Sequence, residues 1–344
     1  MILGKNIGRV FNEGVEIQQV YSHGNLVWER QGDEIDYSVI PFTMRAVEDN
    51  TTIQIISRDG YNQENAVEFK YSINNTEWIQ ADSTLIINLN RSDIISIMAT
   101  DINLCVIKGL GDVYGNIMSL MYGDNFIGKD IWVSHDTAGF FKNCDIRNAR
   151  NLILPATTLK AACYASMFKN CSKLKTAPQL PATTLVERCY YAMFDGCSSL
   201  RTAPQLPATK LAEYCYGLMF SGCSSLKSAP QLPATKLAKY CYYGMFMECS
   251  SLISAPELPA PALASGCYIM MFRDCSSLSY IKCYGYYAAP PGTSVSYPYD
   301  YEYVMNWTVG VSLTGKFVCI NNSFVKSYLI DEIPSTWTIE YIYI

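Results

Sequence analysis

The chain has 344 residues, of which 49% are hydrophobic, and its 26 basic and 31 acidic residues give a net charge of −5. This length suits two or three domains, and the hydrophobic content argues against a disordered chain. The slightly acidic balance, without a block of Lys and Arg, argues against nucleic acid as a partner. No apolar run reaches the ~18–20 residues of a spanning helix, so we expect no membrane insertion.

The N-terminal stretch MILGKNIGRV lacks the charged region and apolar core of a secretory signal. We therefore expect synthesis in a cytosol, with most of the 14 cysteines kept as thiols. Residues 1–30 alternate apolar and polar side chains around the turn Ser22–Asn25, which predicts a small β hairpin. A hairpin of this size folds poorly alone, so residues 1–30 are expected to be a docking module that attaches the chain to a larger assembly.

Residues 37–108 are predicted to form an immunoglobulin-like β-sandwich, because short strands alternate with turn clusters. The hairpin KYSINNTEW (Lys70–Trp78) is its clearest part. Residues 109–136 are expected to be a connector. The expected strands are Ser38–Ala46, Thr52–Ser57, Ala66–Ile73, Glu77–Gln80, Thr84–Leu89 and Ile94–Thr100.

Residues 137–280 are dominated by an internal repeat of 26 residues. In the copy LAEYCYGLMFSGCSSLKSAPQLPATKL, the near-helical spacing of apolar residues predicts a short helix over Leu211–Ser221. The Gly and Ser residues that follow end this helix, and Leu226–Leu232 is expected to run extended through Pro230. Strand–helix units of this length stack into a solenoid. The degenerate stretch Thr137–Leu154 is expected to cap it.

The segment MFSGCSSLKSAPQLPATKL resembles the BspA-like leucine-rich repeats, which carry a recurring aromatic, a Gly-Cys-Ser-Ser-Leu turn and a Pro after the strand. The resemblance covers Thr137–Tyr280. It implies a right-handed solenoid used for adhesion or recognition, found in surface proteins of gut anaerobes and in their phages. The stretches NWTVGVSLTGKFV and IPSTWTIE match the family's closing strands. Residues 281–344 are therefore expected to be a Tyr-rich loop and a β cap, within a chain of α+β or mainly β class.

Two columns of cysteines run through the copies, eight residues apart within each copy. This spacing does not fit a zinc site, and residues eight apart on a helix lie ~12 Å apart, too far for a disulfide. A Cys/His nucleophile is a further reading, but nothing orients His135 toward Cys144. We favour two core ladders of small buried side chains. The ladders are Cys163, Cys189, Cys215, Cys241 and Cys267, and Cys171, Cys197, Cys223, Cys249 and Cys275.

Candidate binding residues come from positions that differ between copies, because positions identical in every copy are expected to face the core. Lys175, Arg201 and Lys227 occupy one place in successive copies and would form a basic ladder for an anionic glycan or phosphate, or else a solubilising face. Lys210 and Lys236 would form a shorter one. The Tyr-rich loop is a second candidate, either for recognition or as a cap. Its candidate residues are Tyr284, Tyr286, Tyr287, Tyr297, Tyr299, Tyr301 and Tyr303.

These observations favour a non-enzymatic recognition or structural protein without cofactor or metal. We expect a phage virion component, tail- or head-associated, whose N-terminal module contacts other virion proteins and whose solenoid binds a host surface glycan or protein. The alternative is an adhesin on a bacterial cell surface, and an enzyme that degrades surface glycan is a third possibility. The sequence leaves homo-oligomerisation open.

Overall fold

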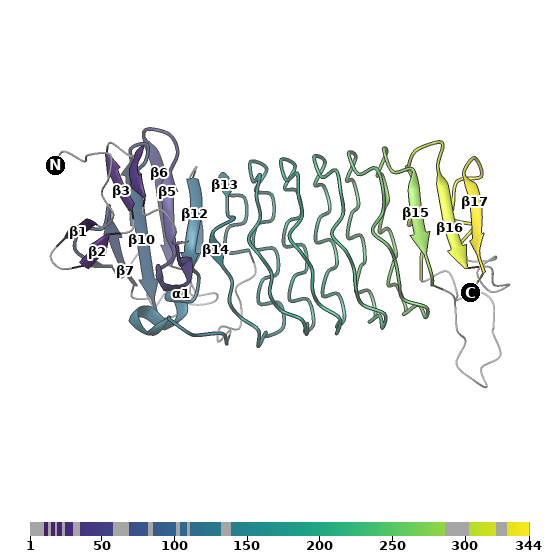
Figure 1. Ribbon diagram of the computed structural model, residues 1–344, viewed down its shortest axis with the longest axis horizontal. Helices are drawn as coiled ribbons and strands as arrows, with labels where there is room; N and C mark the ends of the chain where they lie inside the picture. The colour runs from purple at the N-terminus through teal and green to yellow at the C-terminus, as the bar shows by residue number, and fades with distance from the viewer. Residues whose placement is uncertain are drawn as a thin grey trace.

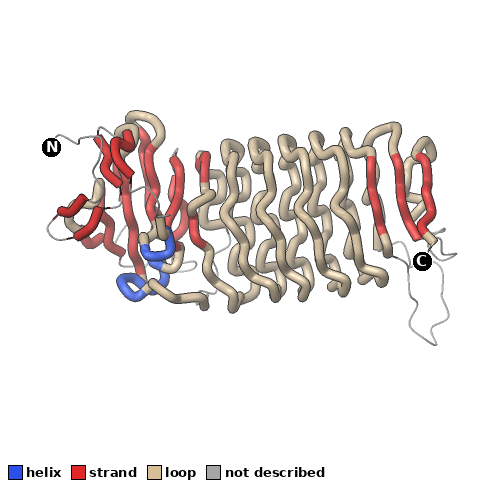
Figure 2. Tube along the Cα trace, in the orientation of Figure 1, coloured by secondary structure: helices blue, strands red, loops and turns tan. Residues whose placement is uncertain are grey.

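The computed structural model describes residues 10–12, 15–17, 19–22, 25–29, 35–57, 69–81, 85–100, 104–108, 111–131, 139–285, 303–320 and 329–343. Side chains are described from residue 35 onward, except at 56–57 and 104–108. The protein is mainly β and elongated, with the N-terminal strands at one end and the C-terminal strands at the other (Figure 1). Between them lies a row of stacked coils with little regular secondary structure (Figure 2).

The N-terminal residues form two hairpins, where the sequence predicted one. Strands β3 (Gln19–Ser22) and β4 (Asn25–Glu29) pair antiparallel across the predicted turn, with Ser22 opposite Asn25. Strands β1 (Val10–Asn12) and β2 (Val15–Ile17) form the second hairpin.

The described residues between 35 and 131 form a β unit of two sheets that share one core. Its strand β12 (Gly111–Asn116) pairs with β13 (Ile146–Asn148), which lies in the following repeats. One sheet has the order β13-β12-β5-β10-β7-β8, and the other has the order β11-β6-β9. Buried side chains from both sheets, such as Ile53 and Leu89 on one and Met44 and Ile97 on the other, belong to a single cluster. The first strands of the unit are β5 (Thr43–Ala46), β6 (Thr51–Ser57), β7 (Phe69–Ile73), β8 (Ile79–Ala81), β9 (Leu85–Leu89), β10 (Ile94–Ala99) and β11 (Leu104–Lys108).

The predicted strands are largely present, and the hairpin formed by β7 and β8 has Phe69 opposite Ala81. Its turn residues Asn74 and Asn75 have φ values of 51° and 57°, which Asn tolerates better than most residues. The start of the first predicted strand was wrong. Tyr37–Val39 is a 3-10 helix, and the side chain of Asp36 caps it by accepting a hydrogen bond from the Ser38 N–H.

The expectation of a connector at 109–136 was wrong for residues 111–131, because these residues are part of the β unit. Strand β12 (Gly111–Asn116) pairs antiparallel with β5 and parallel with β13 (Ile146–Asn148) and β14 (Leu152–Ile153). Helix α1 (Ser119–Tyr122) and the 3-10 helix η2 (Gly123–Asn125) follow. The buried Ser119 hydroxyl accepts a hydrogen bond from the Phe42 N–H and donates one to the Ile97 carbonyl. The β unit and the first repeats are therefore joined through one sheet, by the pairing of β12 with β13 and β14.

The repeats form a coil stack, which we define as residues 139–285 and 303–320. Each 26-residue copy makes one coil, and adjacent coils meet at parallel bridges such as Thr176 to Thr202. We call the residues that surround and separate the two cysteine positions of a coil, such as 213–223, its turn edge. We number the coils by their second cysteine, so that coils 1 to 6 contain Cys144, Cys171, Cys197, Cys223, Cys249 and Cys275.

The predicted helix at Leu211–Ser221 is absent, and a run of tight turns takes its place. Tyr214, Leu218 and Gly222 have φ values of 52°, 53° and 68°, so that every fourth residue is left-handed, which ends any helix. The N–H groups of Tyr216, Leu218, Phe220 and Gly222 donate to carbonyls of coil 5. The N–H groups between them donate to the carbonyl three residues earlier in coil 4. The backbone thus satisfies its donors alternately within and between coils.

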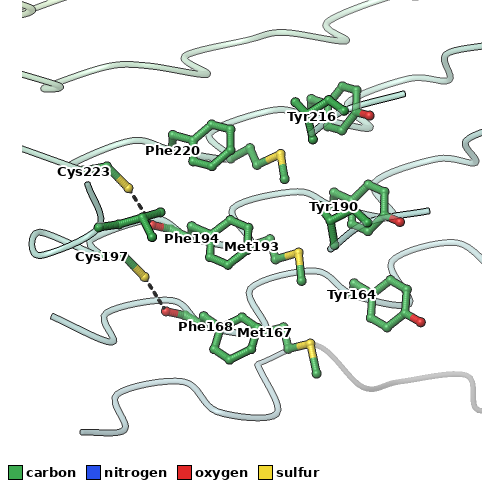
Figure 3. Close-up of a cluster of buried hydrophobic side chains, with 14 of the residues drawn as sticks. Tyr164, Met167, Phe168, Tyr190, Met193, Phe194, Cys197, Tyr216, Phe220 and Cys223 are labelled. Atoms are coloured by element: carbon green, nitrogen blue, oxygen red, sulfur yellow. Dashed lines mark hydrogen bonds between the residues drawn. The ribbon is translucent and has the colours of Figure 1, made fainter. Parts of the chain in front are cut away.

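Two aromatic columns run through the interior of the stack (Figure 3). The phenylalanine column joins Phe168, Phe194, Phe220, Phe246 and Phe272, with ring centroids 5.5–5.9 Å apart and nearly parallel planes. The tyrosine column runs beside it from Tyr164 to Tyr268 with a similar spacing. Phe42 of the β unit lies 5.7 Å from Phe141, which stacks on Phe168. Coil 1, which we expected to cap the stack, is therefore its junction with the β unit.

The stack continues beyond residue 280, where the repeated sequence ends. Tyr303–Val309 forms the turn edge of coil 7 and accepts hydrogen bonds from the N–H groups of coil 6, as between Phe272 and Trp307. Strands β15 (Tyr280–Cys283), β16 (Lys316–Ile320) and β17 (Thr338–Ile342) continue the stack in parallel register. The Trp307 ring lies 6.1 Å from both Tyr268 and Phe272 and covers the ends of both aromatic columns.

Candidate functional site

The predicted basic residues lie side by side on the exposed surface of the stack. Lys175, Arg201 and Lys227 occupy the same place in coils 2, 3 and 4, and all three side chains are exposed. The N–H of Lys175 donates to the carbonyl of Arg147 at 2.9 Å, so Arg147 of coil 1 extends the row. We call these four residues the basic ladder. Neighbouring strands are ~4.8 Å apart, so the ladder spans ~14 Å.

The positive charges of the basic ladder are not neutralised by neighbouring carboxylates. None of the four residues forms an ion pair with another residue in the part of the chain that the structure describes. Lys173 and Asp145 pair with each other nearby, with their N and O atoms 3.1 Å apart. The row of cations ends at coil 5, where Ile253 takes the place and is 58% exposed. The ladder is thus a short positive stripe on a chain with a net negative charge.

Polar side chains line the ladder on the same surface. Thr176, Thr202, Ser228 and Ser254 directly follow the ladder positions, and their hydroxyl groups lie partly or fully exposed. The Thr176 hydroxyl donates to the side-chain oxygen of Asn148. Farther along each coil, a column of exposed amides ends in a carboxylate: Gln179, Gln205, Gln231 and Glu257. This surface presents cations and hydrogen-bonding groups at a regular spacing, which suits a ligand with repeated anionic groups.

Only the two ends of the Tyr-rich segment are described. Tyr286, Tyr287, Tyr297, Tyr299 and Tyr301 lie outside the described residues. The Tyr284 ring lies 4.9 Å from the Lys282 ammonium, which also pairs with Glu257 at 2.6 Å. Hydrogen bonds from Lys282 and Tyr284 lower the pKa of Glu257 below its usual range. Tyr303 belongs to coil 7, where its carbonyl accepts a hydrogen bond from the Tyr268 N–H. The role of the segment in binding stays a prediction.

The ten ladder cysteines all lie in the interior of the stack, and those from Cys171 onward are free thiols. The second column has a further contact, which the sequence did not suggest. The Cys223 thiol donates to the Phe194 carbonyl of the preceding coil at 3.2 Å, and Cys197 and Cys249 make the same bond to Phe168 and Phe220. Burial raises the pKa of Cys215 to about 12. Such thiols remain protonated at neutral pH and are poor nucleophiles and poor metal ligands.

The described residues offer neither a metal site nor a membrane-spanning helix. No group of three or more His, Cys, Asp or Glu side chains in this part of the chain is placed to hold a metal ion. The helices found there are too short and too polar to cross a membrane.

A cluster of tyrosines on the turn edge was not recognised from the sequence. Tyr214 and Tyr240 stack with centroids 4.7 Å apart, and Tyr191 and Tyr243 each meet Tyr214 edge to face at about 6 Å. The Arg188 guanidinium lies 5.3 Å from the Tyr214 ring. We call these five residues the tyrosine patch. Each lies at a position that differs between copies, which was the available signal, but the expected helix did not bring them together.

Arg147 was also missed, for a different reason. It precedes its counterpart Lys175 by 28 residues, whereas the other ladder members are 26 apart.

Comparison of the chain with protein-family models, with curated proteins and with solved structures gave no match. The functional argument therefore depends on the surface of the molecule itself.

Proposed function

We propose that this chain is a non-enzymatic recognition protein whose coil stack is a leucine-rich repeat solenoid of the BspA-like kind. In this proposal the β unit is an immunoglobulin-like sandwich, and the chain is a phage virion component that presents the stack to a host surface. The resemblance of the repeats supports the family, and the two sheets around one core support the sandwich. The basic ladder carries the functional part of the proposal.

The ligand class follows from the ladder. Four cations in one row, none of which forms an ion pair with another described residue, favour an extended anionic polymer over a compact ligand. Hydroxyl and amide columns beside them can bond to the hydroxyl groups of a sugar chain. We therefore propose that an acidic surface glycan lies along the ladder. Because exposed ion pairs are screened by salt, its affinity falls as the ionic strength rises.

Binding of polygalacturonate, a linear polymer of uronic acids, tests the ligand class. Neutral dextran is the control polymer. The double variant Lys175→Glu/Lys227→Glu is expected to lose about tenfold or more in affinity, since each reversed contact costs on the order of 1 kcal/mol. The matched variant Lys210→Glu/Lys236→Glu makes the same charge change in the other lysine column and is expected to bind normally. Equal binding by both variants would contradict the assignment of the ladder.

The location is tested separately, by mass spectrometry of purified phage particles and of bacterial surface fractions. Finding the protein in particles supports the virion role, and finding it only in the cell-surface fraction favours the alternative of an adhesin. Release of reducing sugar from the host glycan would instead indicate the enzyme.

A further inference from the structure

The tyrosine patch has the composition of a protein interface. Its residues lie in two columns, those of Tyr214 and Tyr243, and a third column beside them holds Leu218 in coil 4 and Met270 in coil 6. In coil 2 the three columns hold Ala162, Ala165 and Ser166. Carboxylates are absent from these three columns in coils 2 to 6. Tyr, Met and Arg are enriched at the centres of protein–protein interfaces, where acidic residues are depleted.

The side chains of the patch are also held in place before any partner binds. Large side chains lie over glycines of the next coil: a Cβ at Gly266 would lie 2.0 Å from the Tyr240 ring, and a Cβ at Gly244 would lie 2.6 Å from Leu218. Tyr214 is fixed by Tyr240 and Arg188 on its two sides. Rings that are already ordered lose little side-chain entropy on binding, which favours association.

The charges beside the patch indicate what covers it. The column that precedes the stacked tyrosines holds Glu213 in coil 4 and Lys239 in coil 5, both exposed. Among the described residues neither forms an ion pair, although they are neighbours in one column. The sign of the charge therefore changes at the centre of the patch, between coils 4 and 5.

We propose that a second copy of this chain binds the tyrosine patch, with the two stacks antiparallel. A two-fold axis that crosses the turn edge between coils 4 and 5 places coil 4 opposite coil 5 of the partner. Glu213 then faces Lys239 of the partner subunit, and the reverse contact is made as well. Tyr214 faces Tyr240 of the partner subunit. A parallel arrangement would set like charges against each other at both positions, which is unfavourable.

The proposal predicts a concentration-dependent dimer of the full chain, measured by sedimentation velocity and light scattering. Glu213→Lys and Lys239→Glu are each expected to raise the dissociation constant by about tenfold or more, because each sets two pairs of like charges across the axis. The double variant Glu213→Lys/Lys239→Glu restores both opposite pairs and is expected to dimerise like the parent chain. Lys210→Glu, in the other lysine column, is the control and should leave the dimer unchanged.

Several outcomes would overturn the proposal. One is a chain that stays monomeric at all soluble concentrations. Another is a dimer that is insensitive to the single reversals, or one that the double variant fails to restore. Tyr214→Ala is expected to weaken the dimer, and circular dichroism identifies any variant that fails to fold. None of these measurements involves a glycan, so their result is independent of the role assigned to the basic ladder.

Discussion

The β unit and the coil stack bury their apolar side chains by different means. In the β unit, strands distant in sequence bring unlike residues together, as β10 places Ile95 opposite Met44 and Ala99 opposite Phe69. In the stack, each side chain packs against its own counterpart one coil away, as Phe220 does with Phe194 and Phe246. Repetition makes the stack a chain of nearest-neighbour contacts, so damage at one coil is expected to stay local.

The largest expected effect is a fall in the stability of the coil stack at alkaline pH. Burial raises the pKa of Cys163, Cys171 and Cys215 in the stack from 9.0 to about 12. Below pH 9 these thiols are protonated in both the folded and the unfolded chain. Between pH 9 and 12 only the unfolded chain ionises them, so stability falls by about 1.4 kcal/mol per thiol per pH unit.

Thermal unfolding of the reduced protein between pH 7 and 10.5 measures this fall. Cys215→Ala removes one such thiol and should reduce the slope of stability against pH by one thiol's share. A melting temperature that is constant across this range would show that the thiols titrate normally and are not buried as described.

A cavity in the phenylalanine column is expected to have the next largest effect on stability. Phe220→Ala removes a ring that is 0% exposed between two stacked neighbours and is expected to cost about 3–5 kcal/mol. Because coils contact only their neighbours, hydrogen exchange should rise most in coils 3 to 5. Phe69→Ala in the β unit, where the ring is 2% exposed, is the matched change. It should raise hydrogen exchange across both sheets. If exchange instead rose only near Phe69, the two regions would not differ in how far damage spreads.

Loss of a single thiol contact gives a smaller effect. Cys223→Ala removes the hydrogen bond to the Phe194 carbonyl and the volume of the sulfur, and should destabilise the protein by about 1–2 kcal/mol. Cys223→Ser keeps a donor at this place and should lose less. Urea titration of both variants measures the difference, and a more stable Ala variant would show that the sulfur serves only to fill space.

The smallest effect concerns the left-handed positions of the turn edges. Glu248 is exposed with φ 63°, at a place where coil 4 has Gly222 with φ 68°. Glu248→Gly should stabilise the chain by about 1 kcal/mol, because glycine adopts this conformation without strain. Gly222→Ala should destabilise it by a similar amount, since the added Cβ has ordinary 3.4 Å contacts and only the backbone conformation is strained. Urea midpoints that move the same way in both variants would contradict this account.

The sequence predicted the interior of the stack better than its backbone. Columns that do not vary, such as Cys215, Phe220 and Leu226, are buried, because residues that contact their own copies are constrained alike. The helix prediction failed because it relied on near-helical spacing. The buried residues Cys215, Tyr216, Met219, Phe220 and Cys223 in fact follow a period of four, two inward and two outward. That period fits tight turns, whereas a helix needs 3.6 residues per turn.

On the surface, the repeat pattern predicted the row formed by Lys175, Arg201 and Lys227 but not the tyrosine patch. The row follows from the period alone, since equivalent positions in successive coils must be neighbours. The patch joins residues that lie three apart within one coil, as Tyr240 and Tyr243, and it joins these to residues of a neighbouring coil, as Tyr214. The proximity of these residues depends on the turn geometry. In the β unit, β12 was missed because its parallel partners lie more than 30 residues further along the chain, beyond the reach of local patterns.

The alternation of hydrogen bonds within and between coils has a consequence for evolution. At its turn edge, each interior coil presents N–H donors to the following coil and carbonyl acceptors to the preceding one. Because this pattern is the same in every interior coil, one copy can be removed or duplicated without leaving a mismatched junction. Every such event would change the length of the protein by a single strand spacing, about 4.8 Å, and leave both ends as they were. The length of the molecule can therefore change only in discrete steps, and recombination between near-identical copies of the repeat can adjust it.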